Sequence, residues 1–211
     1  MIKGIVFDLD GTLIDTINIY AEALRSVGEK RGKNLDKEQI RKELGTSSEH
    51  TIKTFFGNVD SIEEEEIHKA WDDESGRIAG KDYTKLLFPE TLEVLKELKR
   101  IGVKTAVASS VGKKALAFLI DKTGLGDLIT ISVSVEEVNK GKPDPAVIKE
   151  ALRRINVKSD EAAVVGDMNW DMIAGKAAGC KTILVDREGK SKDVMSDMKI
   201  KNLKQLLHSI N

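Results

Sequence analysis

The sequence is poor in cysteine, histidine, proline and aromatic residues. It contains one cysteine, three histidines and three prolines among 211 residues, and 4% of its residues are aromatic. A single cysteine cannot form a disulfide within the chain, which is typical of proteins in a reducing compartment. Cys180, His68 and His208 have no companions at the spacing of a metal site or a nucleophilic site, so we assign no function to them.

The chain also lacks an excess of charge of either sign and any long apolar run. It has 34 Lys and Arg against 35 Asp and Glu, and this balance gives no electrostatic reason to bind nucleic acid or an anionic membrane. No run approaches the roughly 18 apolar residues of a membrane span. Carboxylates from position 8 onward argue against a secretory signal peptide. We therefore expect a cytoplasmic protein that binds neither nucleic acid nor membrane.

The apolar residues that are present, 40% of the chain, are enough to form a hydrophobic core. Five short runs are rich in β-branched residues and nearly continuous in apolarity, as in strands covered on both faces. They are IKGIVF (2–7), VKTAVA (103–108), LITISVS (128–134), AAVV (162–165) and KTILV (181–185). Helical patterns lie between the runs. This alternation predicts an α/β fold, a Rossmann-like three-layer parallel sheet with right-handed crossovers.

Two of the helical patterns have recognisable ends. Residues 90–100 place leucines on one face of a helix, and Gly102 provides a natural stop. In residues 143–155, we expect Asp144 to cap the helix and Pro145 to be its first residue.

Residues 16–87 have a different pattern from the rest of the chain. They show helical periodicity and acidic clusters but no strand alternation. We expect a helical insert placed directly after the first strand, while residues 1–15 and 88–211 form the sheet-containing core. Phe55, Phe56 and Trp71 fall in helical patterns of the insert and are expected to pack in its interior.

The clearest candidate site follows the first strand, in Asp8-Leu9-Asp10-Gly11-Thr12. Two carboxylates spaced two residues apart can face the same site if the chain turns, and Gly11 permits a sharp turn because it has no Cβ. In parallel sheets, ligands bind outside the carboxyl ends of the strands. Taken alone, an Asp-x-Asp sequence also fits an ordinary acidic turn.

Polar groups follow the second and third strands as well. Ser109 and Ser110 precede a helical segment, where hydroxyls and free backbone N–H groups either form an anion site or cap the helix. Lys142 follows the third strand by a short loop, and Pro143 disfavours a helical conformation at that lysine. Each of these features is weak by itself.

A second pair of carboxylates follows the fourth strand. Asp167 ends the strand, and Asp171 falls in the first turn of the next helix, where a carboxylate suits the helix dipole and Asn169 is available as a cap. Because the carboxyl ends of parallel strands meet at one edge, the four strand ends together predict a single site.

These residues resemble the four motifs of the haloacid dehalogenase-like hydrolases. The matching motifs are Asp8-Leu9-Asp10-Gly11-Thr12, Ser109, Lys142, and Gly166-Asp167 with Asp171. The resemblance covers residues 1–15 and about 88–211. A helical insert directly after the first motif is similar to the family's first cap type, found in phosphoglycolate phosphatases, β-phosphoglucomutases, phosphonatases and the dehalogenases themselves. The resemblance therefore implies that residues 16–87 form a small all-helical cap domain.

The resemblance further implies phosphoryl transfer with Mg²⁺. Asp8 would be the nucleophile and a metal ligand, giving an aspartyl-phosphate intermediate. Asp10 would offer its backbone carbonyl to Mg²⁺ and its side chain as general acid, then general base. Asp167 would complete the metal shell. Mg²⁺ prefers such hard oxygen ligands, and its charge allows a carboxylate to approach a phosphate dianion.

The remaining motif residues would hold the substrate. Lys142 would neutralise charge on the nucleophile and on the phosphoryl group, so it is both a catalytic and a substrate-binding residue. Asp171 would orient Lys142 or a metal-bound water. The other residues that the resemblance assigns to substrate binding are Ser109, Ser110, Gly11 and Thr12.

The motifs also discriminate among reactions within the family. Dehalogenases lack a carboxylate at the position of Asp10 and need no Mg²⁺, so Asp10 and Asp167 favour phosphoryl chemistry. Phosphonatases rely on a Schiff-base lysine in the cap, and we expect the cap lysines here to be solvated. The pair Gly166-Asp167 resembles phosphatases more than β-phosphoglucomutases, which have Glu-Asp at that position.

We therefore predict a Mg²⁺-dependent phosphatase that acts on a small phosphomonoester, such as a sugar phosphate or phosphoglycolate. The alternative is a phosphomutase of the β-phosphoglucomutase type. A third hypothesis is a non-enzymatic phospho-aspartate switch, against which the helical insert and Asp10 both argue. The expected partner is a small phosphorylated metabolite, and the expected state is a monomer or a weak homodimer.

The sequence says less about which residues of the insert contact the substrate. The polar segment 45–50 is expected to be a loop at the site, with His50 exposed to solvent. For Trp170, inside the fourth motif, packing beneath the loop and contact with the substrate both remain open.

Overall fold

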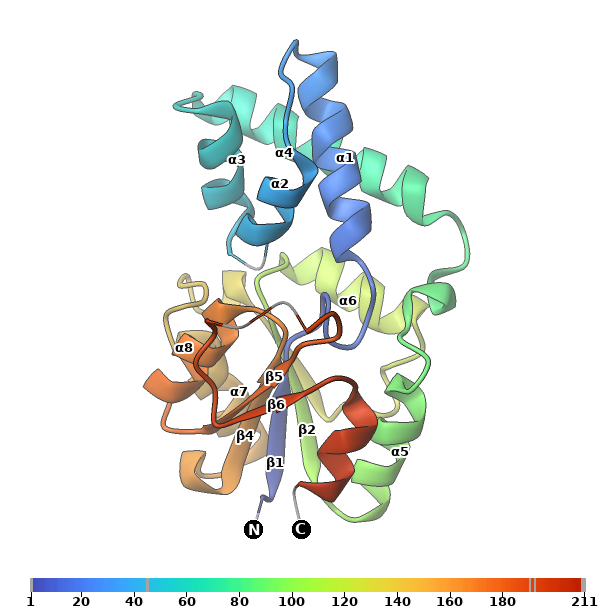
Figure 1. Ribbon diagram of the computed structural model, residues 1–211, viewed down its shortest axis with the longest axis vertical. Helices are drawn as coiled ribbons and strands as arrows, with labels where there is room; N and C mark the ends of the chain where they lie inside the picture. The colour runs from blue at the N-terminus through green and yellow to red at the C-terminus, as the bar shows by residue number, and fades with distance from the viewer. Residues whose placement is uncertain (1, 45, 190, 192, 210–211) are drawn as a thin grey trace.

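The computed structural model describes residues 2–44, 46–189, 191 and 193–209. Within these ranges the chain forms one six-stranded sheet in which every pair of neighbouring strands is parallel. The strand order is β3-β2-β1-β4-β5-β6, so β1 lies at the centre (Figure 1). The strands are β1 Gly4–Phe7, β2 Lys104–Ser109, β3 Ile131–Ser134, β4 Ala162–Gly166, β5 Lys181–Val185 and β6 Met198–Ile200.

Helices cover both faces of the sheet and complete three layers. The helices around the sheet are α5 Thr91–Arg100, α6 Lys113–Lys122, α7 Ala146–Ile155 and α8 Asn169–Ala177. On one face, Ile5 and Phe7 pack in a cluster with leucines of α5 and α6 and of the 3₁₀ helix η4 Leu203–His208. On the other face, Val6 packs against α7 and α8. Successive residues of β1 thus point to opposite faces, and both faces are buried.

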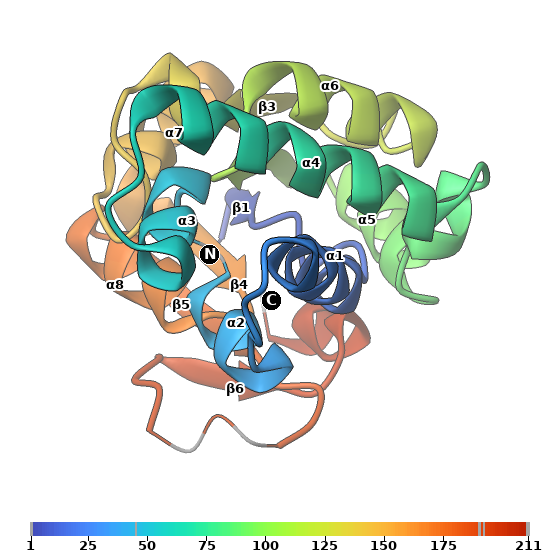
Figure 2. The ribbon, with the colours of Figure 1, turned by 90° about the horizontal axis from the view of Figure 1, so that it is seen from above.

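Four further helices lie between β1 and β2 in the sequence and stand over the carboxyl ends of the strands (Figures 1 and 2). They have a hydrophobic cluster of their own, which includes Leu24, Ile40, Ile52 and Trp71. Asp36, Ser47 and Asp60 cap three of the helices through side-chain oxygens that accept backbone N–H groups. The helices are α1 Ile17–Lys30, α2 Lys37–Glu43, α3 Ser48–Phe56 and α4 Ser61–Ala79.

Two chain segments connect the helical group to the sheet, and they are hydrogen-bonded to each other. The backbone N–H of Asp15 donates to the carbonyl of Leu86 at 2.6 Å, and that of Phe88 donates to the carbonyl of Leu13 at 3.2 Å. The 3₁₀ helix η1 Tyr83–Leu86 precedes this junction. The two connections therefore leave the sheet side by side.

The α/β fold and the five expected strands are confirmed, but several details of the prediction were wrong. The third strand begins at Ile131 rather than residue 128, and β6 was not predicted. Helix α7 begins at Ala146, so Pro145 takes the cap position, while the carboxylate of Asp144 accepts the N–H of Ala146 at 2.9 Å. Over the described residues, no helix has the length and apolarity needed to cross a bilayer.

Segment 45–50 was expected to be a loop, and this expectation was also wrong for most of it. Residues 48–50 are the first turn of α3, where the Oγ of Ser47 accepts the N–H of His50. Gly45 lies outside the described residues. A polar sequence of this kind suits a helix N-terminus because the hydroxyl replaces the missing intrahelical acceptor.

Candidate active site

The turn after β1 brings two carboxylates to the centre of the sheet edge. Asp8 is buried, and its backbone N–H still belongs to the sheet, donating to the carbonyl of Val165 at 2.8 Å. The chain then turns at Gly11, whose φ of +78° is a conformation that other residues adopt only with strain. Asp10 is half-buried and lies in the wall of the same cavity as Asp8.

A buried lysine joins this turn to the loop after β4. The Nζ of Lys142 lies 2.6 Å from Oδ1 of Asp8, 2.6 Å from Oδ1 of Asp171 and 3.3 Å from the carbonyl oxygen of Ala108. Its side chain is 1% exposed. Burial alone would lower the pKa of Lys142, but the charges of Asp171 and Asp8 outweigh it and hold the pKa above its ordinary value. Lys142 is therefore a fixed cation between two carboxylates.

The loop after β4 supplies Asp167, and the first turn of α8 supplies Asp171. The Oδ2 of Asp171 accepts the N–H of Met168 at 3.1 Å, so this carboxylate and not Asn169 closes the start of α8; the expected cap was wrong. A Cβ on Gly166 would lie 2.4 Å from Asp171, so only glycine allows the carboxylate to pack there.

Asp167 packs equally closely against the first turn. A Cβ on Gly11 would lie 2.3 Å from Oδ2 of Asp167. The hydroxyl of Thr12 donates to Oδ1 of Asp167 at 3.2 Å. The absence of a side chain at position 11 thus has two consequences, the turn and the close approach of a second carboxylate.

Three of these carboxylates form a group that can hold a divalent cation. One oxygen each from Asp8, Asp167 and Asp171 lies within 4.8 Å of the others. Burial, only partly offset by Lys142, raises the pKa of Asp8 to about 7, and burial together with the charge of Asp8 raises that of Asp167 well above its ordinary value. Crowded, buried carboxylates with one lysine carry excess negative charge, and hard oxygen ligands of this kind suit Mg²⁺ or a similar ion. The donor set therefore fits a divalent cation.

The side chain of Asp10 contacts the residue at the start of the helical group and is not one of the three carboxylates just described. The hydroxyl of Thr16, the residue before α1, donates to Oδ1 of Asp10. Burial raises the pKa of Asp10, and the hydrogen bond from Thr16 acts in the opposite direction. The carboxyl of Asp10 thus faces the junction between sheet and helical group, while its expected contribution to the metal was its backbone carbonyl.

The end of β2 contributes the hydroxyls. Ser109 is buried, and its Oγ accepts the N–H of Val111 at 3.1 Å. Ser109 and Ser110 line the same cavity as Asp8 and Asp10. The structure therefore brings all four motifs to one place.

The cavity itself has a volume of about 680 Å³ and lies between the strand ends and the helical group. This volume lies within the range of small-molecule sites. Helix α4 contributes His68, Trp71 and Asp72, and α1 contributes Tyr20. The Nδ1 of His68 lies 3.3 Å from Oδ2 of Asp72, and this hydrogen bond raises the pKa of the histidine.

These residues of the helical group were not predicted to reach the site. His68 was assigned no function, and Trp71 was placed in the cap interior, where it does lie, although its edge also reaches the cavity. Positions 68, 71 and 72 share one face of α4 by their spacing, so helical periodicity was the available signal. His50 is exposed, as expected, and Trp170 is half-buried; neither belongs to the cavity wall.

The fold and this site together define a protein of the α/β class with a group of carboxylates at the carboxyl edge of its parallel sheet. The model of the haloacid dehalogenase-like hydrolase family matches residues 5–185. The chain therefore belongs to the haloacid dehalogenase-like hydrolases. Within this family it is a phosphatase.

Curated relatives and solved structures agree with this family. A pyrophosphatase PpaX from Bacillus velezensis is 30% identical over 215 residues, covering 98% of this chain and 95% of its own, and one from Bacillus cereus is 28% identical over 188 residues, covering 87% and 83%. A β-phosphoglucomutase from Clostridium difficile has a TM-score of 0.85 at 20% identity, covering 98% and 93% of the two chains. CbbY from Rhodobacter sphaeroides has a TM-score of 0.82 at 22% identity, covering 98% and 96%. At these identities the two structures establish the fold alone.

Proposed function

We propose that this protein is a Mg²⁺-dependent phosphatase that hydrolyses a small phosphomonoester, such as a sugar phosphate or phosphoglycolate, through an aspartyl-phosphate. One observation carries the proposal: Lys142 binds Asp8 and Asp171 at once, at 2.6 Å each, and Asp8 lines a cavity that Ser109 also lines. A carboxylate paired with a fixed cation is held in place for attack on phosphorus.

The first step forms a bond between a carboxylate oxygen of Asp8 and phosphorus and breaks the bond from phosphorus to the leaving oxygen. Asp10 donates a proton to that leaving oxygen. In the second step Asp10 takes a proton from water, the water oxygen attacks phosphorus, and the acyl-phosphate bond to Asp8 breaks. Asp171 pairs with Lys142 and so keeps the ammonium of Lys142 next to Asp8.

The phosphoryl group would be bound by groups from three of the four motifs. Lys142 neutralises charge on its oxygens. The hydroxyls and backbone N–H groups that donate to it come from Ser109, Ser110, Gly11 and Thr12.

The metal would be held by Asp8, Asp167 and the backbone carbonyl of Asp10. When bound, Mg²⁺ supplies positive charge that offsets repulsion between the nucleophile and the phosphate. Asp171 lies close enough to this group to act on a metal-bound water as well as on Lys142.

Residues 16–87 would serve as a cap domain over a core of residues 1–15 and 88–211. The two paired connections near Leu13 and Leu86 form the natural hinge between them. Closure of the cap would exclude bulk water while the bond from Asp8 to phosphorus forms, and would bring the side chains of α1 and α4 to the leaving group. The cytoplasmic location and the monomer or weak homodimer stay predictions.

Two other reactions fit the same machinery. The PpaX relatives from Bacillus cereus and Bacillus velezensis, 28% and 30% identical to this chain, favour diphosphate as a substrate, and its leaving group would be phosphate. A phosphomutase would return the phosphoryl group to a second hydroxyl instead of to water. Release of inorganic phosphate from sugar phosphates, against rearrangement seen by NMR, distinguishes hydrolysis from transfer.

The nucleophile is tested by Asp8→Asn, which keeps the shape of the side chain and removes its charge. We expect turnover to fall by at least about 10³-fold, because an amide oxygen does not form the acyl-phosphate. Phosphate release and circular dichroism are measured together. The matched control is Asp15→Asn, an exposed carboxylate of the same connection, with unchanged turnover. Substantial activity of Asp8→Asn with a native spectrum contradicts the assignment.

The metal is tested on the unmodified enzyme. Treatment with EDTA should abolish phosphate release, and Mg²⁺ should restore it, because the buried carboxylates need a cation before a phosphate dianion can approach. Full activity after exhaustive EDTA treatment would overturn the metal requirement. If another divalent ion restores activity and Mg²⁺ does not, the assignment of Mg²⁺ as the cofactor is wrong, and the assignment of Asp8 as the nucleophile is unaffected.

A further inference from the structure

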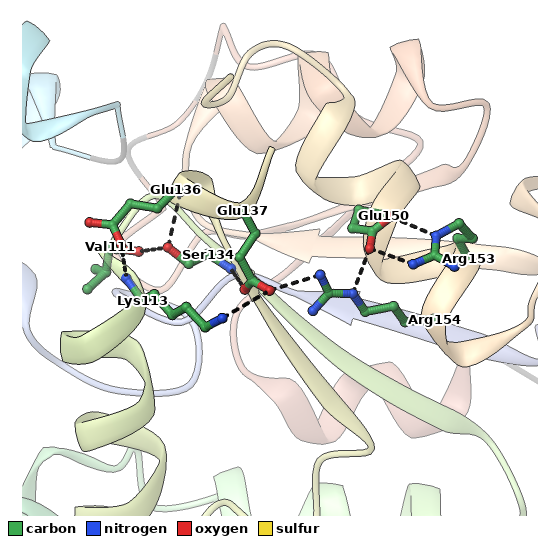
Figure 3. Close-up of polar contacts among 8 residues, drawn as sticks. All are labelled: Val111, Lys113, Ser134, Glu136, Glu137, Glu150, Arg153 and Arg154. Atoms are coloured by element: carbon green, nitrogen blue, oxygen red, sulfur yellow. Dashed lines mark hydrogen bonds and ion pairs between the residues drawn. The ribbon is translucent and has the colours of Figure 1, made fainter. Parts of the chain in front are cut away.

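The wall of the cavity beside the second motif contains a carboxylate that the proposed reaction does not use. Glu136 belongs to the 3₁₀ helix η2 Val135–Glu137, directly after β3, and lines the cavity together with Ser109, Ser110 and Gly112. Its side chain reaches across to the start of α6, where its Oε2 accepts the N–H of Lys113 at 2.9 Å (Figure 3).

The position of this carboxylate is fixed from two sides. A Cβ on Gly112 would lie 2.7 Å from Oε1 of Glu136, so the carboxylate fills the space that a side chain would take. On its backbone side, Glu136 donates its N–H to the Oγ of Ser134 at 3.2 Å, and that hydroxyl donates to the carbonyl of Val111 at 2.7 Å. The turn after β2, which contains Ser109 and Ser110 and is proposed to bind phosphate, and Glu136 are therefore parts of one hydrogen-bonded unit.

The neighbouring residue Glu137 points elsewhere. Its carboxylate accepts the N–H of Ser134 at 3.0 Å and pairs with Arg154 at 2.9 Å, and it does not line the cavity (Figure 3). Two adjacent glutamates thus differ in role: Glu137 pairs with the partly exposed Arg154, and Glu136 faces the substrate cavity.

The charge of Glu136 is not neutralised by an ion pair. The described helices α1 to α4 contribute two acidic residues to the cavity wall, and each of them contacts a basic side chain. Glu49 pairs with Lys53 at 2.6 Å, and Asp72 contacts His68. Glu136 forms no ion pair with a described residue and accepts only from a backbone amide. Lys114 also lines the cavity and, like Glu136, is exposed, but no contact with a described residue holds its ammonium in place.

We infer that Glu136 is a specificity-determining residue that disfavours substrates whose leaving group carries a second negative charge. The inference rests on the proposed phosphatase function and narrows its substrate class to phosphomonoesters with an uncharged or cationic leaving group, which favours sugar phosphates over phosphoglycolate among the substrates proposed above. A fixed carboxylate next to the phosphate-binding turn repels a second phosphate or carboxylate that extends along this wall, whereas a hydroxyl or an amide meets no such repulsion. Diphosphate is accordingly a poor substrate despite the names of the relatives.

The experiment compares phosphoglycolate with phosphoglycolamide, which have almost the same shape and differ by one charge. For Glu136→Gln, the ratio of kcat/KM for the acid to that for the amide rises about fivefold over the wild type, equal to about 1 kcal/mol of charge repulsion in a wet site. The kcat/KM for diphosphate rises in parallel. For the matched control Glu137→Gln, the ratio stays at the wild-type value, although thermal stability falls because the ion pair with Arg154 is lost.

A second measurement needs no variant to fold. In the wild type, raising the salt from about 20 mM to about 500 mM screens the repulsion and increases the acid-to-amide ratio several-fold. An unchanged acid-to-amide ratio in Glu136→Gln, or an equal change of this ratio in Glu137→Gln, overturns the inference. In either case, phosphate release by the wild type still supports the proposed phosphatase. Failure of the wild type to release phosphate from p-nitrophenyl phosphate and from both test compounds overturns the proposed function and this inference with it.

Discussion

At the scale of single residues, the site depends as much on side chains that are absent as on those that react. Gly11 and Gly166 leave the space into which Asp167 and Asp171 pack, at 2.3 Å and 2.4 Å from where a Cβ would stand. Both carboxylates approach a nucleophile that is itself negative, and Lys142 is the described cation that pairs directly with this group. The two glycines therefore allow negative charge to gather around Asp8, and a bound divalent cation would neutralise that charge.

This dependence is tested by Gly11→Ala against Gly32→Ala. Both glycines have a positive φ, +78° and +71°, but a Cβ on Gly32 would meet nothing within 4 Å. We expect Gly32→Ala to cost about 1 kcal/mol of unfolding free energy from backbone strain alone. Gly11→Ala should cost more and, by displacing Asp167, raise the Mg²⁺ concentration for half-maximal activity about tenfold. Urea unfolding and Mg²⁺ titration measure the two effects; equal costs and equal Mg²⁺ dependence would contradict this account.

At the scale of elements, the C-terminal part of the chain braces the junction between sheet and cap. Arg187, after β5, donates to Oε1 of Glu90 at 2.6 Å and to the carbonyl of Thr12 at 3.0 Å. Its guanidinium lies 3.4 Å from the ring centroid of Phe88. One arginine therefore ties together the first motif, the second connection to the cap and the start of α5.

The brace predicts a pH dependence of stability. Burial alone would raise the pKa of Glu90, but Arg187 and the backbone N–H of Leu203 outweigh it, so the pKa lies below its ordinary value. A lowered pKa in the folded state means that the pair stabilises the fold above the unfolded-state pKa near 4.5, and that this contribution is lost as the pH falls below it.

We therefore expect the stability advantage of the wild type over Glu90→Gln to be largest near neutral pH and to shrink from about pH 4.5 downward. Chemical denaturation at several pH values measures it. Glu97, which pairs with solvent-exposed Arg100 along α5, supplies the control: Glu97→Gln should change stability much less than Glu90→Gln does, because solvent screens this pair. A constant difference between wild type and Glu90→Gln across this range would rule out the ion pair as its source.

At the scale of the whole molecule, the structure has separate hydrophobic clusters in the sheet layers and in the helical group. A cavity of about 680 Å³ lies between the two parts, and two paired connections join them. Among the described apolar residues of α1 to α4, Ile19 packs against the cluster of the sheet layers, whereas Leu24, Ile40, Ile52 and Trp71 belong to the core of the helical group itself.

This arrangement predicts that the helical group unfolds at a lower denaturant concentration than the sheet. The chain has two tryptophans, Trp71 in the cluster of the helical group and Trp170 in α8. In Trp170→Phe the fluorescence of Trp71 reports on the cap, and in Trp71→Phe that of Trp170 reports on the core. We expect the first transition to precede the second in urea. Coincident transitions in both variants would show one cooperative unit.

The sequence by itself determined the α/β class, five of the six described strands and the motif residues that meet at the sheet edge. Strands covered on both faces are continuous apolar runs, and parallel strands necessarily place their carboxyl ends together, so local pattern and topology suffice. The strand β6 escaped prediction because Met198 and Lys199 are exposed and only Ile200 is buried, which leaves no apolar run.

The tertiary structure alone decided which other side chains meet the motifs. His68 and Asp72 reach the cavity only because the helical group stands over the strand ends, and Glu136 differs from Glu137 only by the direction in which η2 presents it. Such contacts join residues dozens of positions apart, and a charged side chain looks the same in sequence whether it faces water or a substrate. Packing, not local pattern, makes that distinction.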